Sequence, residues 1–303
     1  GSLLLGSASE NTPGNQSISH LYLDGNLTGT NAIMVKNRGN VKIHDCTIID
    51  FLWNGITLTN SPNVITPPTT RATGNEIYNC VIDNCTDSAG SWRGGHLIQV
   101  TGQDGLWVHD NLLYANKRAV GYNGDIFSTC GQGFSRRIKY YNNESWKPDN
   151  DGDTWNFHLE LFNNYGGSEI YGNEFYGGDC IIDITGMYEN IKGDDTYSYR
   201  IYNNYATGAP VSTYHGKMFI DIEGDLNEDI YIYNNHTKNL PVFLNTTDNT
   251  YPPSNTRRIY IYNNLLENLG WNNASIYNTN INLHNGNASS VLEDVYFYNN
   301  VIE

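Results

Sequence analysis

The sequence has few charged residues, fewer basic than acidic ones, and no long apolar run. Charged residues make up 16% of the 303 residues, and 32 Asp and Glu stand against 17 Lys and Arg, a formal net charge of −15. Binding of phosphate backbones needs a basic face, so nucleic acid is not an expected partner. No apolar run approaches the roughly 18 residues of a membrane-spanning helix, so no membrane span is expected.

Common metal and catalytic motifs are also missing. The 5 cysteines have no zinc-ligand spacing and leave an odd one over, so we interpret them as small buried side chains. The sequence contains no glycine-rich phosphate loop, nucleophile elbow or HExxH segment. No helical-bundle or coiled-coil pattern is present either. The 23 tyrosines, with abundant asparagine and glycine, instead suit strands and tight turns.

A short motif recurs along the whole chain, for example Ile201-Tyr202-Asn203-Asn204. Its copies end at Cys46, Cys80, Asn111, Asn143, Asn173, Asn204, Asn235, Asn264 and Asn300. Successive copies are 29 residues (264 − 235) to 36 residues (300 − 264) apart, a period that indicates a solenoid. Each copy predicts a short strand and a turn, and the final side chains of stacked coils would hydrogen-bond as a ladder.

The sequence therefore predicts an all-β, single-domain parallel β-helix over residues 1–303. It would have about nine to ten coils, stacked about 4.8 Å apart, with an asparagine ladder. Cys46 and Cys80 take the ladder position in the first coils, which favours a buried structural role for them. The end at Glu303, soon after the last motif, is compatible with truncation at the C-terminus.

A second strand is predicted after each ladder residue. Its period-two alternation points Ile98, Leu159, Ile182 and Ile220 inward. The outward positions would form a column along the molecule, which reads Thr57, Gln99, Gly121, Glu160, Asp183, Asp221, Asn245 and Asn282. A neighbouring column would read Thr59, Thr101, Asn123, Phe162, Thr185, Glu223 and His284.

Three consecutive coils thus place carboxylates in single file, namely Glu160, Asp183 and Asp221. Like charges this close are destabilising unless a proton, a cation or a substrate relieves them. A raised pKa on the central Asp183 is what a general acid needs. Three interpretations stay open: carboxylates that form a solvated acidic face or hydrogen-bond to the turn backbones, a glycosidase-type carboxylate pair, and a calcium site that includes Asp221 and Glu223. His158 is expected to flank Glu160 as a proton carrier or substrate donor.

Insertions of variable length lie between the ladder residues and the second strands. In solenoids such insertions map to loops on one side, often the binding side. Their aromatic side chains could pack on the apolar faces of sugar rings, and their basic ones could hold an acidic sugar. With the polar strand positions, the candidate substrate-binding residues are Gln99, Arg93, Trp92, Trp155, Asn123, Arg118, Tyr214 and His215.

The repeats cover nearly the whole chain and include openings such as Leu21-Tyr22-Leu23-Asp24-Gly25-Asn26. These repeats resemble those of the right-handed parallel β-helix proteins of the pectate-lyase-like superfamily. The resemblance implies right-handed coils with three sheets, and a secreted or cell-surface protein that acts on polysaccharides. Arg137-Ile138-Lys139 matches one block of polygalacturonase-like hydrolases, and Gly178-Asp179-Cys180 echoes another. The Asp-Pro-His-Asp box of alginate epimerases is absent, and the family within the superfamily is not indicated.

The leading hypothesis is an extracellular glycoside hydrolase that cleaves a polysaccharide lying along the helix axis. It would use Glu160, Asp183 and Asp221, with Asp183 as the acid, and would need no cofactor. Carboxylates on adjacent coils suit the roughly 5 Å of a retaining mechanism, and a two-coil gap suits the roughly 6.5–9.5 Å of an inverting one. One alternative is a polysaccharide lyase that binds Ca²⁺ and uses a Lys, Arg or His base. Another is a non-catalytic sugar-binding or adhesive module.

Overall fold

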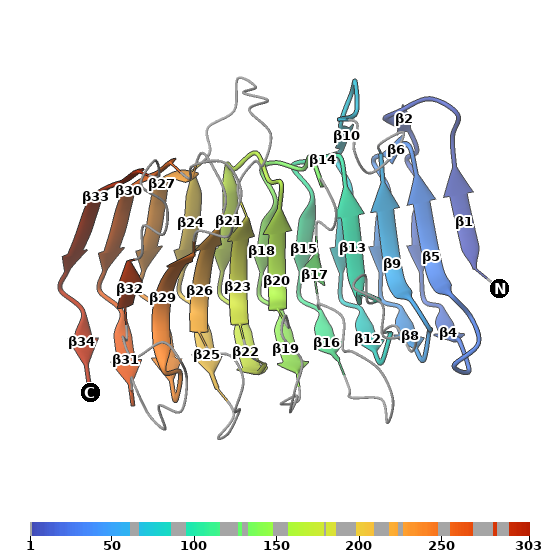
Figure 1. Cartoon of the computed structure of the whole chain (residues 1–303). Helices are drawn as coiled ribbons and strands as arrows, with labels where there is room; N and C mark the ends of the chain where they lie inside the picture. The colour runs from blue at the N-terminus through green and yellow to red at the C-terminus, as the bar shows by residue number, and fades with distance from the viewer. Residues whose placement is uncertain are drawn as a thin grey trace.

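The chain folds into a parallel β-helix (Figure 1). The computed structural model describes residues 2–60, 67–85, 95–115, 127–128, 133–147, 157–178, 180–185, 198–208, 218–223, 227–247, 255–268, 281–283 and 291–303. Within these residues the strands form three parallel sheets of 10 strands each, and Figure 1 shows the coils stacked along one axis. The described residues contain no helix that could cross a membrane. The predicted fold class is confirmed.

Each coil visits the three sheets in the same order. Sheet 1 contains β1 (Leu3–Gly6), β5 (Asn31–Lys36), β9 (Asn54–Thr59), β13 (Ile98–Thr101), β17 (Phe127–Ser128), β20 (Phe157–Phe162), β23 (Cys180–Thr185), β26 (Met218–Glu223), β29 (Val242–Thr247) and β32 (Ile281–Leu283). Sheet 2 contains β3 (Ser17–Ser19), β7 (Lys42–His44), β11 (Glu76–Tyr78), β15 (Trp107–His109), β18 (Lys139–Tyr141), β21 (Ser168–Tyr171), β24 (Tyr199–Tyr202), β27 (Asn227–Tyr233), β30 (Asn255–Tyr262) and β33 (Val291–Tyr298).

Sheet 3 follows the ladder residue of each coil. It contains β4 (Tyr22–Asp24), β8 (Thr47–Ile49), β12 (Val81–Asp83), β16 (Leu112–Tyr114), β19 (Glu144–Lys147), β22 (Glu174–Gly177), β25 (Tyr205–Thr207), β28 (His236–Lys238), β31 (Leu265–Glu267) and β34 (Val301–Ile302). Two short pairs bridge sheets 1 and 2 in the early coils, β2 (Thr12–Pro13) with β6 (Arg38–Gly39) and β10 (Ala72–Thr73) with β14 (Gln103–Asp104).

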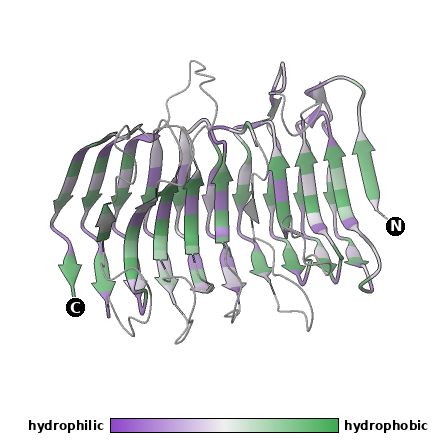
Figure 2. Ribbon diagram, in the orientation of Figure 1, coloured by the Kyte–Doolittle hydropathy of each residue, from purple (hydrophilic) through white to green (hydrophobic). Residues whose placement is uncertain are grey.

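The core consists of apolar columns that run along the helix axis. The isoleucine of the repeated motif forms one of them on sheet 2, for example at Ile77, Ile170, Ile201 and Ile232, and these side chains are at most 1% exposed. On sheet 1 the predicted inward residues Ile98, Leu159, Ile182 and Ile220 are all fully buried, as expected. Figure 2 shows hydrophobic segments on strands of all three sheets. Each such buried side chain contributes about 1.5–3 kcal/mol relative to exposure.

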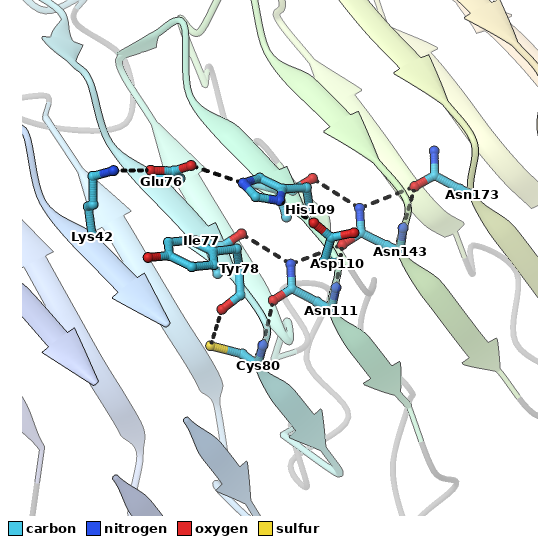
Figure 3. Close-up of polar contacts among 11 residues, drawn as sticks. Lys42, Glu76, Ile77, Tyr78, Cys80, His109, Asp110, Asn111, Asn143 and Asn173 are labelled. Atoms are coloured by element: carbon cyan, nitrogen blue, oxygen red, sulfur yellow. Dashed lines mark hydrogen bonds and ion pairs between the residues drawn. The ribbon is translucent and has the colours of Figure 1, made fainter. Parts of the chain in front are cut away.

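The last two residues of the motif have different tasks. The first of them sits in the left-handed region, with φ of 55° at Asn203 and Asn234 and 65° at Gly172, which Asn, Asp and Gly tolerate best. The second is the ladder residue. In Figure 3, Asn111 donates to Asn143 Oδ1 from its backbone nitrogen (3.1 Å) and from Nδ2 (2.9 Å). The same pattern continues through the later coils, so the predicted ladder is confirmed.

The motif tyrosine forms a continuous stack of rings on the outer face of sheet 2. Neighbouring ring centroids are 4.6 to 5.2 Å apart with planes within 7° of parallel. The stack comprises His44, Tyr78, His109, Tyr141, Tyr171, Tyr202, Tyr233, Tyr262 and Tyr298. Since the rings cover each other's faces, inner members of the stack present only their edges. The faces of these inner rings are therefore closed to a sugar ring.

Cys80 is a weak rung of the ladder, and we expect Cys80→Asn to stabilise the protein. The Cys80 thiol lies 3.8 Å from the carbonyl oxygen of Ile43, whereas the Asn111 amide reaches its equivalent acceptor at 3.1 Å. An asparagine would restore these amide hydrogen bonds and raise the free energy of unfolding by about 1 kcal/mol.

Urea unfolding of the wild type and the variant measures this gain. Cys85→Asn is the matched control, because Cys85 is equally buried but stands outside the ladder, with its thiol 3.3 Å from the Asp83 carbonyl oxygen. We expect it to destabilise by about 1–3 kcal/mol. Equal effects of the two substitutions would contradict the assignment of Cys80 to the ladder.

Candidate functional site

The predicted carboxylate column exists on the outer face of sheet 1. Glu160 on β20 pairs with Asp183 on β23, and Asp183 pairs with Asp221 on β26. Parallel strands stand about 4.8 Å apart, so the three side chains start from backbones at that spacing. Asn245 continues the column in the next coil.

One position of the predicted column is wrong. Ser128, and not Gly121, stands between Gln99 and Glu160. The prediction places this strand nine residues after Asn111 (120 − 111), by analogy with Asn173 and Ile182 (182 − 173). The observed strand comes later in the coil, where the backbone of Phe127 pairs with those of Ile98 and Leu159.

Asp183 and Asp221 face away from the core but are nonetheless buried, with exposed fractions of 2% and 3%. Thr185 Oγ1 donates to Asp183 Oδ2 at 2.7 Å, and Asn245 Nδ2 donates to Asp221 Oδ1 at 3.0 Å. Glu160 is half-buried. The interpretation as a solvated acidic face is therefore wrong for the two aspartates.

An apolar column borders the carboxylates on one side. It consists of Phe157, Cys180, Met218 and Val242, which form a separate buried cluster. Burial of two neighbouring carboxylates beside apolar groups disfavours two negative charges, because each loses hydration and repels the other. A proton on one of them would relieve this repulsion, and a protonated carboxylate is what general acid catalysis uses.

The calcium hypothesis finds no support among the described residues. No group of three or more His, Cys, Asp or Glu side chains in this part of the chain is arranged to hold a metal ion. The backbone of Glu223 pairs with that of Thr185, two residues along the strand from Asp221, but the Glu223 side chain lies outside the described residues.

The expected position of His158 beside Glu160 is wrong. His158 is fully buried in the core, where Nε2 donates to the Gly177 carbonyl oxygen at 2.9 Å and Nδ1 accepts from Ser145 Oγ at 2.8 Å. Burial lowers the pKa of His158 to about 3, with the Lys147 charge as a further cause. A neutral imidazole with both nitrogens bonded is a structural group. It does not serve as a proton carrier for the carboxylates.

Among the predicted substrate-binding residues, Gln99 is placed as expected. It is half-buried in the carboxylate column, and its Oε1 accepts from Asn54 Nδ2 at 2.9 Å. The other predicted binding residues lie outside the described residues: Trp92, Arg93, Arg118, Asn123, Trp155, Tyr214 and His215.

The sequence prediction assigns no functional role to Thr185 and Asn245, the side chains that donate hydrogen bonds to the two aspartates. Thr185 follows Asp183 by two residues and so shares its face of the strand, a spacing that indicates a hydroxyl donor. Asn245 occupies the next coil of the same column, and stacking brings its amide to Asp221. Both signals are present in the sequence once the columns are aligned.

The sequence was compared with models of known protein families and with curated proteins, and neither comparison finds a match.

Proposed function

We propose that this protein is a carbohydrate-active enzyme of the pectate-lyase-like type, a secreted or cell-surface glycoside hydrolase. The observation that carries the proposal is the buried Asp183–Asp221 pair on adjacent coils, continued by Glu160. Two carboxylates in different environments are what general acid and base or nucleophile roles require. The substrate is a polysaccharide whose chain runs along the column.

The two aspartates have different partners, which supports different roles. Asp221 accepts an amide hydrogen from Asn245, an interaction that favours its ionised form and suits a base or nucleophile. Asp183 also accepts a hydrogen bond, from the Thr185 hydroxyl, but it lies between two other carboxylates that disfavour its ionised form, which suits the proton donor. A spacing of about 5 Å between adjacent coils corresponds to the retaining mechanism.

The experiment is a screen of plant, algal and microbial polysaccharides, followed by kinetics on any substrate that is cleaved. We expect Asp183→Asn to lower kcat at least about 100-fold while substrate binding persists, because the amide keeps the shape but supplies no proton. Asp294→Asn is the matched control. Asp294 is an exposed aspartate on β33 of sheet 2, and its left-handed φ of 56° is one that asparagine tolerates.

The alternatives give different outcomes. Full activity of Asp183→Asn, Glu160→Gln and Asp221→Asn on a confirmed substrate would show that the column is not the active site. Loss of activity with a chelator, with unsaturated uronide products, would identify a calcium-dependent lyase instead. Binding of a glycan by the wild type without any turnover would identify a non-catalytic module.

A further inference from the structure

A second group of reactive side chains lies far from the carboxylate column in the sequence, on the outer face of sheet 2. Ser17 Oγ is 2.6 Å from His44 Nε2, and His44 Nδ1 is 2.6 Å from Asp45 Oδ2. Hydroxyl, imidazole and carboxylate are thus joined in the order in which serine hydrolases join them, with each contact at hydrogen-bond distance. None of the three residues takes part in the proposed glycosidase site.

The fold holds the three groups in place. Strands β3 and β7 pair with Ser19 opposite His44, so Ser17 is two residues earlier on the same face. The His44 ring stacks on Tyr78, with centroids 4.7 Å apart and planes 6° from parallel, and this contact fixes the orientation of the imidazole. On its other side His20 meets it edge to face at 6.1 Å.

Asp45 is also positioned by the backbone. It directly follows β7 in the left-handed region, with φ of 52°, and this conformation brings its carboxylate beside His44 Nδ1. The hydrogen bond from His44 holds the pKa of Asp45 below its ordinary value. The carboxylate is therefore ionised at neutral pH. In that state it favours the His44 tautomer with hydrogen on Nδ1, which leaves Nε2 as the acceptor toward Ser17.

The chain contains an internal comparison for this site. His109 Nδ1 and Asp110 Oδ2 form the same pair at 2.7 Å, but His109 Nε2 meets Glu76 Oε1 at 3.0 Å instead of a serine hydroxyl (Figure 3). Both sites therefore have an imidazole hydrogen-bonded to a carboxylate, but of the two only the His44 site has a serine hydroxyl at the imidazole. A carboxylate in the position of Ser17 offers no proton for the imidazole to remove, so of these two sites the Ser17 site alone pairs the imidazole with a hydroxyl.

We propose that Ser17, His44 and Asp45 form an acyl-transfer site that hydrolyses small carboxylic esters, such as O-acetyl groups. Ser17 Oγ attacks the ester carbonyl carbon while its proton passes to His44 Nε2. The carbon–oxygen bond to the alcohol then breaks, and the alcohol leaves with that proton. Water adds to the acyl-serine by the same route, releasing the carboxylic acid and restoring the Ser17 hydroxyl. Asp45 orients His44 and stabilises the imidazolium that forms in each half-reaction.

The test uses a fluorophosphonate, which serine nucleophiles attack at phosphorus with loss of fluoride, and p-nitrophenyl acetate as the ester. We expect the wild type to carry one adduct, mapped to Ser17 by mass spectrometry, and to release p-nitrophenol. Ser17→Ala should abolish both signals, and His44→Asn and Asp45→Asn should slow them at least about tenfold.

Three control variants show whether labelling depends on this site. Ser19→Ala removes a serine from the same strand and face, and Asp110→Asn removes the acid of the comparison pair; both should leave labelling unchanged. Asp183→Asn should also be labelled at the wild-type rate, because Ser17 reacts independently of the carboxylate column. The two proposals can therefore fail separately. An unlabelled wild type, an adduct on another residue, or labelling that does not depend on His44 and Asp45 would overturn the proposal.

Discussion

Asn204→Ala is expected to lower the free energy of unfolding by about 4 kcal/mol, because the substitution leaves buried donors without partners. Asn204 Oδ1 accepts from the backbone nitrogen of Asn173 at 3.1 Å and from Asn173 Nδ2 at 2.9 Å. Its own Nδ2 donates to Asn235 Oδ1 at 2.9 Å and to the Ile170 carbonyl oxygen at 3.0 Å. Alanine removes all four contacts in a position that is 2% exposed, where water cannot replace them.

Urea unfolding followed by circular dichroism measures the loss. The neighbouring residue of the same motif provides the control. Asn203 holds a left-handed φ of 55° and stands outside the ladder, so Asn203→Gly keeps the conformation and should cost less than about 1 kcal/mol. Similar losses from the two substitutions would mean that the ladder contributes no more than any other turn residue.

The repeated motif is sufficient to predict the fold because each of its residues has one structural task. Isoleucine enters the core, tyrosine stacks outside, the first asparagine tolerates the left-handed turn, and the second forms the ladder. These tasks depend only on contacts with the same motif in the adjacent coils. Matching the inward apolar residues of the second strands, coil by coil, then places Glu160, Asp183 and Asp221 in one column, as the strand pairing confirms.

The error at His158 has a specific physical cause. Strict alternation would send His158 to the opposite side from Leu159, but the strand begins at a corner where two consecutive residues both enter the core. Later coils carry an apolar doublet at this place, Ile181-Ile182, Phe219-Ile220 and Phe243-Leu244, and all of these side chains are fully buried. The doublets are a signal that alternation fails there, and they indicate a core position for His158.

The burial of Asp183 and Asp221 could not be predicted from the same alignment. A column position specifies the face of the sheet and the neighbours in adjacent coils. It does not specify how much of each side chain its neighbours cover. The strand at Phe127–Ser128 could not be predicted for a related reason, since the preceding insertion is longer than in the coil used for comparison.

The protein is expected to lose about 4–5 kcal/mol of stability through His158 alone as the pH falls from 6.5 to about 3. The pKa of His158 is lowered from 6.5 to about 3 in the folded protein, first because of burial and then because of the Lys147 charge. Between these two values the unfolded chain binds a proton that the folded protein does not. Stability due to this group is therefore complete above pH 6.5, falls by about 1.4 kcal/mol per pH unit below it, and levels off near pH 3.

The histidine contribution is isolated by comparing the wild type with His158→Gln, because other acidic groups titrate in the same range. Glutamine can donate to the Gly177 carbonyl oxygen and accept from Ser145, but it does not titrate. We expect the wild type to be the more stable protein at pH 7 and its advantage to shrink by about 1.4 kcal/mol for each pH unit below 6.5. Ile182→Val, which weakens the same core by about 1 kcal/mol but retains the histidine, should keep the wild-type slope. A constant difference between the wild type and His158→Gln from pH 7 to pH 4 would show that His158 is protonated as readily in the core as in the unfolded chain.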